Sequence, residues 1–235
     1  MRPEKFASVQ AQRLPGSDDY SCRPFDEHRC IFVHVPKCAG ISISKSLFGN
    51  LAGAHQSLRK YQIMFSPAEF ASYFKFTFVR NPWDRLVSAY FFLKNGGITA
   101  SDKAWSQRHL QQHDTFDSFV RNGITRREIL KFPHFRPQTS FICLRPGLPG
   151  VDFIGFFENL AADFEIVRSR LQLQASLQNL NRTASRDKNF ADCYSNETRA
   201  IVARVYQDDL AVLGYTFDNS TLPAMLARRD AGKRR

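Results

Sequence analysis

The sequence predicts an α/β fold in which a mostly parallel central sheet is flanked by helices. Three short apolar segments resemble buried strands, and a helical pattern follows each of them; they are Ile31–Val35, Lys75–Arg80 and Val151–Phe157. Parallel strands are covered on both faces, so they carry continuous apolar runs rather than alternating ones. Strands that alternate with helices along the chain are typical of a parallel sheet.

A polar stretch precedes the first strand. Residues 1–29 contain three prolines and a glycine among polar side chains, so we expect an irregular arm over the surface. After the strand at Ile31–Val35, residues 36–40 should form a loop. A helix is then expected from Ile41 to Phe48, because Gly49-Asn50 is a usual helix stop.

The second strand leads into a helix with clear start signals. Asn81 can cap this helix, Pro82 suits its first turn, and the helix should run through Phe92 until Asn95-Gly96-Gly97 closes it. A further short helix is expected over Phe116–Arg121.

The third strand should be followed by a helix from about Leu160 to Leu173. Residues 179–189 are polar and basic, which predicts a loop, whereas the apolar spacing within 196–213 predicts one amphipathic closing helix. Residues 221–235 look like a frayed, solvated basic tail. The chain has 235 residues, enough for one sizeable core, so we expect a single domain over 30–220 between the arm, residues 1–29, and the tail.

Composition narrows the class of protein. The net charge of +11 favours anionic partners such as nucleic acid, an anionic membrane, a phosphorylated cofactor or an acidic sugar. No run approaches the roughly 20 apolar residues that span a bilayer, and no signal peptide is evident, so we expect a cytoplasmic protein without stable membrane insertion. Five widely spaced cysteines without a Cys-X-X-Cys pair argue against a disulfide framework and a zinc site.

The loop after the first strand has the features of an anion-binding site. A strand, a tight loop and a helix together present backbone N–H groups and a helix dipole to an anion. Within it, Lys37 supplies a positive charge and Ser42 a hydroxyl. The lysine precedes the single glycine, so this is not the GxxxxGK[ST] loop of nucleotide hydrolases. Taken alone, the loop could equally be a turn with an exposed lysine.

A second segment adds groups that could bind an anion. Arg80 stands at the carboxyl end of the second strand, where open α/β sheets bind ligands, and Ser88 lies on the helix that follows. Arg85 is either another anion contact or a structural partner for Asp84 or a carboxylate elsewhere. We favour the structural role.

Together these stretches resemble the carbohydrate sulfotransferases that use 3′-phosphoadenosine 5′-phosphosulfate (PAPS). Four further segments resemble the same family in the same order: Gly53–Ser57, His134–Gln138, Asp152–Leu160 and Asp208–Phe217. The resemblance implies a P-loop-like three-layer fold. It also implies an enzyme that transfers a sulfuryl group from PAPS to a hydroxyl of a carbohydrate or glycoconjugate, with 3′,5′-ADP as product, no metal ion and no nucleic-acid partner.

The resemblance implies roles for individual residues. The loop after the first strand would hold the 5′-phosphosulfate, and Arg80 with Ser88 would hold the 3′-phosphate. Lys37 would stabilise the negative charge that develops on the leaving group during an in-line transfer. Arg182 lies in a basic loop similar to the family's lid over the donor. The donor-binding residues are then Lys37, Cys38, Ala39, Gly40, Ile41, Ser42, Arg80, Ser88 and Arg182.

The acceptor hydroxyl needs a base, and an imidazole with an ordinary pKa of about 6.5 suits this task. His55 is our candidate because it matches the histidine segment of the family. His134 is the rival, although it could instead brace the donor pocket or the core. His34 lies on a buried strand, where a hydrogen-bonded core role is expected. Glu158 could serve as a base, but a turn carboxylate that fixes nearby backbone is the expected role.

Two positions depart from the family pattern. Ile41 stands where the family usually has Thr or Ser, and Phe156 stands where an arginine is common. Because Ile41 lacks a hydroxyl, an alternative is that the protein is a catalytically inactive relative that binds a bisphosphate or a glycan.

Two other classes fit less well. A P-loop kinase with a degenerate loop would require Mg²⁺, a reordered lysine and an acidic metal ligand after a strand. A nucleic-acid-binding module would carry basic residues along one face, whereas Lys37, Arg80 and residues 182–188 lie where strands or their loops end. Residues 95–131 are rich in Lys, Arg, His and Gln, which suits either an anionic glycan or a solvated surface.

Overall fold

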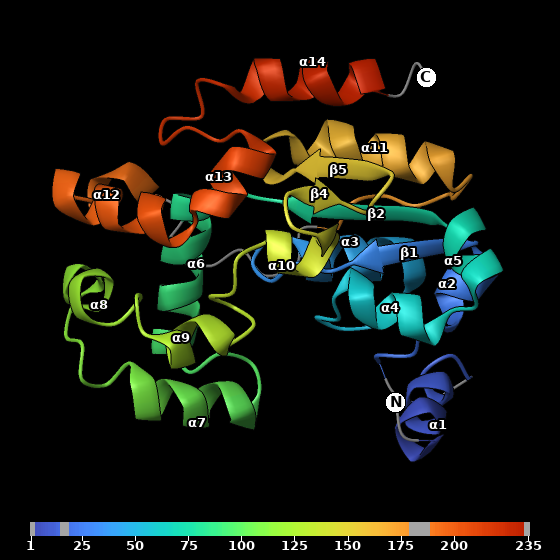
Figure 1. Cartoon of the computed structure of the whole chain (residues 1–235), viewed down its shortest axis with the longest axis horizontal. Helices are drawn as coiled ribbons and strands as arrows, with labels where there is room; N and C mark the ends of the chain where they lie inside the picture. Colours follow the sequence, from blue (N-terminus) through green and yellow to red (C-terminus); the bar gives the residue numbers. More distant parts are fainter. Residues whose placement is uncertain (1–2, 15–18, 179–188, 233–235) are drawn as a thin grey trace. The chain divides into compact units, whose positions relative to one another are not determined.

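The computed structural model describes residues 3–14, 19–178 and 189–232 (Figure 1). The chain divides into two compact units. The sheet unit is made of Met1–Val79 and Gln138–Asn181, and the helical unit is made of Arg80–Pro137 and Arg182–Arg235.

Three parallel strands form the central sheet of the sheet unit, in the spatial order β1, β2, β5. The strands are β1 (Cys30–Val33), β2 (Phe74–Val79) and β5 (Phe153–Phe156). The register sets Phe32 beside Phe76 and Phe76 beside Phe153. The rings of Phe32 and Phe76 stack with their centroids 5.0 Å apart, so aromatic side chains fill one row of the sheet. The predicted α/β fold with a parallel sheet is confirmed.

Helices flank this sheet. Figure 1 shows α11 alongside β5, on which it packs, and α2 packs against β1. A short antiparallel hairpin, β3 (Cys143–Arg145) with β4 (Leu148–Pro149), accompanies them. The helices of the sheet unit are α1 (Pro3–Ala11), α2 (Arg23–Glu27), α3 (Gly40–Phe48), α4 (Leu58–Met64), α5 (Pro67–Ser72), α10 (Thr139–Ile142) and α11 (Leu160–Arg170), and the 3₁₀ turn Phe157–Asn159 precedes α11.

The N-terminal stretch is more ordered than its composition suggests. We expected residues 1–29 to be irregular, and this was wrong, because α1 and α2 lie within them. Pro24 is in the first turn of α2, where its missing N–H costs nothing, so it starts the helix rather than breaking it. The next residue, Phe25, is fully buried, with its ring edge-on to Phe48 and Tyr61 at 5.5 and 5.7 Å.

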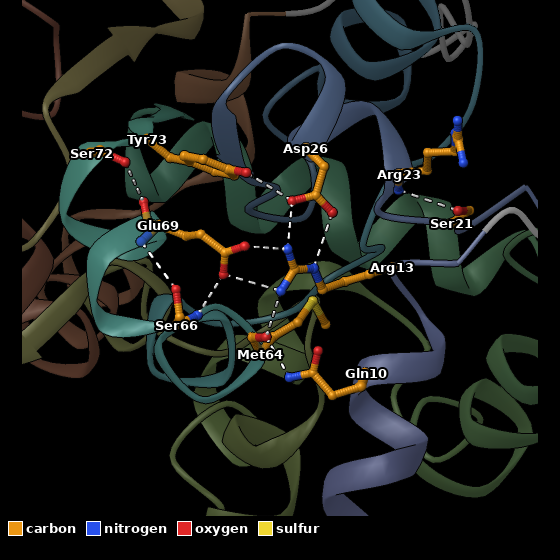
Figure 2. Close-up of polar contacts among 10 residues, drawn as sticks. All are labelled: Gln10, Arg13, Ser21, Arg23, Asp26, Met64, Ser66, Glu69, Ser72 and Tyr73. Atoms are coloured by element: carbon orange, nitrogen blue, oxygen red, sulfur yellow. Dashed lines mark hydrogen bonds and ion pairs between the residues drawn. The ribbon is translucent and has the colours of Figure 1, made fainter.

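An arginine fixes this stretch to the rest of the sheet unit (Figure 2). Arg13 pairs with Asp26 of α2 and with Glu69 of α5, each at 2.7 Å. The hydroxyl of Tyr73 donates to the same Asp26 carboxylate at 2.9 Å. The guanidinium also lies over the ring of Phe65, 4.7 Å from its centroid. One side chain therefore joins three segments that are distant in sequence.

The helical unit is built around α6. Its buried side chains pack with those of α8 and α12 into one apolar cluster that includes Leu86, Tyr90, Phe119 and Val202. The predicted helices over Pro82–Phe92 and Phe116–Arg121 are present. The elements of the unit are α6 (Pro82–Lys94), α7 (Ala100–His109), α8 (Phe116–Asn122), α9 (Arg127–Lys131), a 3₁₀ turn (Phe190–Cys193), α12 (Asn196–Val205), α13 (Gln207–Leu213) and α14 (Leu222–Gly232).

Two predictions for the C-terminal part were wrong. The single helix expected over 196–213 is interrupted at Tyr206, whose φ of −108° and ψ of 27° are not helical. The Tyr206 side chain is buried, and its hydroxyl donates to the carbonyl of Phe135 at 2.8 Å, which fixes the break. The expected frayed tail contains α14, where Arg228 donates to the carbonyl of Leu213 at 3.1 Å. No helix in the described part of the chain is both long and apolar enough to cross a membrane.

Candidate active site

The loop that leaves β1 is built from strained backbone. Lys37 and Ala39 have positive φ angles of 69° and 60° although neither is a glycine. Such a conformation costs a residue with a side chain on the order of 1–2 kcal/mol and persists where the surrounding structure imposes it. Positive-φ residues in a tight turn are a feature of the backbone concavities that bind anions.

The helix that follows this loop starts without a side-chain cap. The N-cap of α3 is Ala39, which has no side-chain oxygen, and the first turn contains no acidic residue. At the start of α5, α6, α7, α8 and α12 a backbone N–H donates to the N-cap side chain, which belongs to Ser66, Asn81, Thr99, Thr115 and Ser195 respectively. The helices α2, α4, α9, α10, α11 and α13 lack such a cap, as α3 does. The positive end of the α3 dipole is therefore neither capped nor neutralised by these means, which favours an external anion.

The side chains of the loop are only partly exposed. Lys37 and Ile41 are half-buried, whereas Cys38 and Ser42 are buried. The thiol of Cys38 lies 3.4 Å from the side-chain oxygen of Gln138. Gln138 is fully buried and ends one of the segments that the sequence had singled out. The glutamine of that segment thus packs directly against the predicted anion loop.

His55 lies half-buried between α3 and α4. Its Nδ1 is 3.3 Å from the backbone carbonyl oxygen of His34, and the two imidazole rings meet edge-to-face with centroids 4.4 Å apart. A carbonyl only accepts hydrogen bonds, so this contact requires the proton on Nδ1. A neutral His55 then has its lone pair on Nε2, the tautomer that can accept a proton from a substrate.

The N-terminal segment fastens the loop that carries His55. The carbonyl groups of residues 19–21 accept hydrogen bonds from the backbone N–H groups of Leu51 (2.6 Å) and Gly53 (3.0 Å) and from the side-chain amide of Asn50 (3.0 Å). The sheet unit therefore brings together two predicted features, the anion loop and His55, next to the end of β1.

Arg80 and Ser88 belong to the helical unit. Arg80 follows the last residue of β2, and its guanidinium pairs in two places with Asp84, at 2.7 and 2.6 Å. This pair uses two of the five guanidinium N–H donors and fixes the plane of the group. Asp84 and Ser88 are four residues apart on α6, so they lie on one face of that helix.

Arg85 and His134 occupy the interior of the helical unit. Arg85 is 1% exposed and donates to the backbone carbonyl of His134 at 3.2 Å, which fits the structural role expected of it. The carboxylate of Asp84 pairs with Arg80 instead. The imidazole of His134 is buried in a sandwich between Phe92 and Phe132, with centroids 5.1 and 5.3 Å away. That environment resembles a packed core more than an open catalytic surface.

The remaining sequence predictions concern Arg182, a metal site and the cysteines. Arg182, together with nearly all of the predicted 179–189 loop, lies outside the described residues. Within the described residues, no three or more His, Cys, Asp or Glu side chains gather into a set that could hold a metal ion. The five cysteines are not joined to one another by disulfide bonds.

Comparison with known proteins identifies the family. A model described as the sulfotransferase family matches residues 23–216. The chain belongs to the sulfotransferase family. This match covers the anion loop, His55, Arg80 and Ser88, and it extends to Thr216 beyond α13.

Two proteins resemble this chain over part of its length. Carbohydrate sulfotransferase 14 of Danio rerio is 28% identical over 174 residues, which cover 62% of this chain and 47% of the relative. An uncharacterised protein of Archaeoglobus fulgidus is 31% identical over 119 residues, which cover 50% of this chain and 83% of that protein. The chain thus spans about half the length of the Danio rerio relative. No solved structure matches the present chain.

Among the structural carboxylates that sequence reasoning missed is Asp163, near the start of α11. Asp163 is fully buried and accepts hydrogen bonds from the backbone N–H of Phe156 at 2.7 Å and the side-chain amide of Asn159 at 2.9 Å. It therefore fixes the turn from β5 into α11, a role that we had expected of Glu158. An acidic residue in the first turn of a predicted helix was the signal that could have identified it.

Proposed function

We propose that this sulfotransferase moves a sulfuryl group from PAPS to a hydroxyl of a carbohydrate or glycoconjugate. The observation that carries the proposal is the uncapped start of α3, with Lys37 in the preceding loop and His55 beside the same strand end. The family match supports the class of reaction. The name of the Danio rerio relative supports a carbohydrate acceptor.

The residues present fit an anionic donor of this kind. Ala39 brings no competing oxygen to the α3 N-terminus, and the backbone before it already has a conformation suited to an anion. We assign the 5′-phosphosulfate to the loop from Lys37 to Ser42. Arg80 and Ser88 are assigned to the 3′-phosphate, and Arg182 to a further donor contact.

The chain supplies charge, position and a base. PAPS, when bound, supplies an activated sulfuryl group attached to a phosphate leaving group. Lys37 offsets negative charge where it develops, and such preorganised groups are worth most in a site that excludes water. Nε2 of His55 accepts the proton of the acceptor hydroxyl, which contributes about 10²–10⁴-fold in rates of this type. We propose no metal in this reaction.

One observation favours a second function. Ile41 is half-buried in the first turn of α3 and has no hydroxyl to offer a bound anion. A protein that binds 3′,5′-ADP or a glycan without turnover would tolerate this loss. The two functions differ in one result, because only the enzyme transfers sulfate.

The donor assignment is tested by thermal unfolding with nucleotides. We expect 3′,5′-ADP to raise the melting temperature, 2′,5′-ADP to raise it less, and ATP with Mg²⁺ to have little effect. Lys37→Ala should weaken the stabilisation by 3′,5′-ADP. Lys45→Ala is the matched control, because it removes the same charge from the last turn of α3, where the lysine pairs with Asp19. A stronger response to ATP with Mg²⁺ would instead support a kinase.

A further inference from the structure

The imidazole of His34 lies between the start of α3 and His55. His34 directly follows β1 and is 4% exposed, and the sequence suggested only a core role for it. In the proposed reaction the start of α3 binds the donor and His55 is the base, so His34 lies between the two.

One side of the ring abuts Gly40. A Cβ atom added at Gly40 would lie 1.9 Å from Cδ2 and 2.0 Å from Nε2 of His34. Gly40 is not among the glycines with a positive φ, so its backbone conformation does not require glycine. The requirement is steric, and it comes from the His34 ring. The first residue of α3 therefore sits directly against this imidazole.

The other sides of the ring are enclosed as well. His55 packs edge-to-face on it at 4.4 Å, with an angle of 71° between the ring planes. Phe32 stacks against it at 5.6 Å and 12°. The backbone of His34 holds His55 too, through the 3.3 Å contact of Nδ1 with the carbonyl oxygen. A shift of the His34 ring away from Gly40 would therefore disturb His55.

We propose that His34 is a positioning residue that sets His55 relative to the first turn of α3. The inference rests on the proposed role of His55 as the base. His34 contacts both the residue that takes the proton and the helix start assigned to the donor, without itself touching a reacting atom. Catalytic groups must be held closely in place, since a displacement of about 1 Å can lower a rate by about 10²-fold.

A double-mutant cycle tests this role. We expect His34→Asn to lower kcat by about tenfold to a hundredfold, with the KM for the acceptor little changed. His55→Ala should lower kcat further than His34→Asn does. Adding His34→Asn to His55→Ala should cost almost nothing more, because a residue that acts through His55 has no effect once His55 is gone. His28→Asn is the control, because that ring stacks on Phe48 at 6.0 Å elsewhere in the sheet unit.

The outcomes separate this inference from the proposed function. If the two losses multiply in the double variant, His34 does not act through His55 and the inference fails while the base stands. If His55→Ala alone leaves kcat unchanged, the base assignment fails and this inference fails with it. Stabilisation of each variant by 3′,5′-ADP reports whether the fold and the donor loop survive.

A second pair of variants tests the contact without any assay of activity. Gly40→Ala should lower the melting temperature, because the new Cβ collides with the His34 ring. In a His34→Ala background the same change should cost much less, since the ring is absent. An equal cost of Gly40→Ala in both backgrounds would contradict the contact on which the inference depends.

Discussion

Replacing Arg13 by Met tests the ion pairs that join the N-terminal segment to the rest of the sheet unit. Met keeps much of the apolar stem but removes the guanidinium (Figure 2). That group pairs with Asp26 and Glu69, and its side chain is 20% exposed. Removing one partner of a fully buried pair costs about 3–5 kcal/mol, whereas exposed pairs contribute about 0–1 kcal/mol. With two carboxylates and intermediate exposure, we expect a loss of about 2–3 kcal/mol.

The pH dependence of this loss gives an internal check. Hydrogen bonding to Arg13, with a backbone hydrogen bond at Ser66, lowers the pKa of Glu69 from its ordinary 4.5 to about 2. A carboxylate with a depressed folded-state pKa stabilises the fold at pH values above the unfolded-state pKa. That contribution is lost as the pH falls from about 4.5 towards 2. The difference between wild type and Arg13→Met should therefore be largest near neutrality and should shrink below pH 4.

Thermal and urea unfolding at pH 7 and pH 3 measure both effects. For a chain of this size, about 1 kcal/mol shifts the melting temperature by about 2–4 °C, so a drop of roughly 4–12 °C is expected at pH 7. Arg23→Met is the matched control. Its ion pair with Glu27 is about half exposed on both sides and should contribute less than 0.5 kcal/mol, about the value of such helix pairs. Equal losses of unfolding free energy in Arg13→Met and Arg23→Met would contradict a special role for the ion pairs of Arg13.

Three further predictions concern other positions. Ala39→Gly should stabilise the protein by about 1 kcal/mol because Ala39 has φ 60°. The control Ala162→Gly, at an exposed position in the first turn of α11, should destabilise it, and two losses would contradict the strain argument. Burial, with the nearby charges of Arg126 and Lys94, lowers the pKa of His113, so the unfolded chain takes up its proton first and stability should fall as the pH drops below about 6.5. In His113→Asn the melting temperature should change less with pH, as measured between about pH 7.5 and about pH 5. An unchanged pH dependence would show that His113 is not the group responsible. Asp163→Ala should cost about 3 kcal/mol or more by urea unfolding, because it strands the buried N–H of Phe156; a loss below about 1 kcal/mol would contradict this.

The elements that were predictable from the sequence carry local signals. The strand at Cys30–Val33 is a short apolar run, and α3 ends at Gly49 in the left-handed conformation that glycine favours. Asn81 caps α6 through its side chain, as its place before Pro82 indicated. In each case the residues that determine the structure lie within a few positions of it.

The elements that were missed depend on contacts distant in sequence. Pro24 suggested a break but lies in the first turn of α2. That helix is held by Phe25 in the core and by the pairing of Asp26 with Arg13. The interruption at Tyr206 depends on a carbonyl 71 residues away. No local pattern contains that information.

The candidate site shows the same division. The strand, loop and helix around Lys37 were predictable because their residues are contiguous, and anion binding by this loop stays a prediction. The pairing of Arg80 with Asp84 was also within reach of the sequence, because the two are four residues apart. The contact between His34 and His55 was not, since it depends on how the loop after α3 returns to the end of β1.

Transfer of radiolabelled sulfate from PAPS to a mixture of carbohydrate acceptors tests the central claim most directly. We predict label in the acceptor fraction with the wild-type protein and with Lys45→Ala. We predict a loss of about 10²-fold or more with Lys37→Ala, and a comparable loss with His55→Ala, although both variants remain folded. No transfer by a wild-type protein that is stabilised by 3′,5′-ADP would contradict the enzyme and support a binding protein instead.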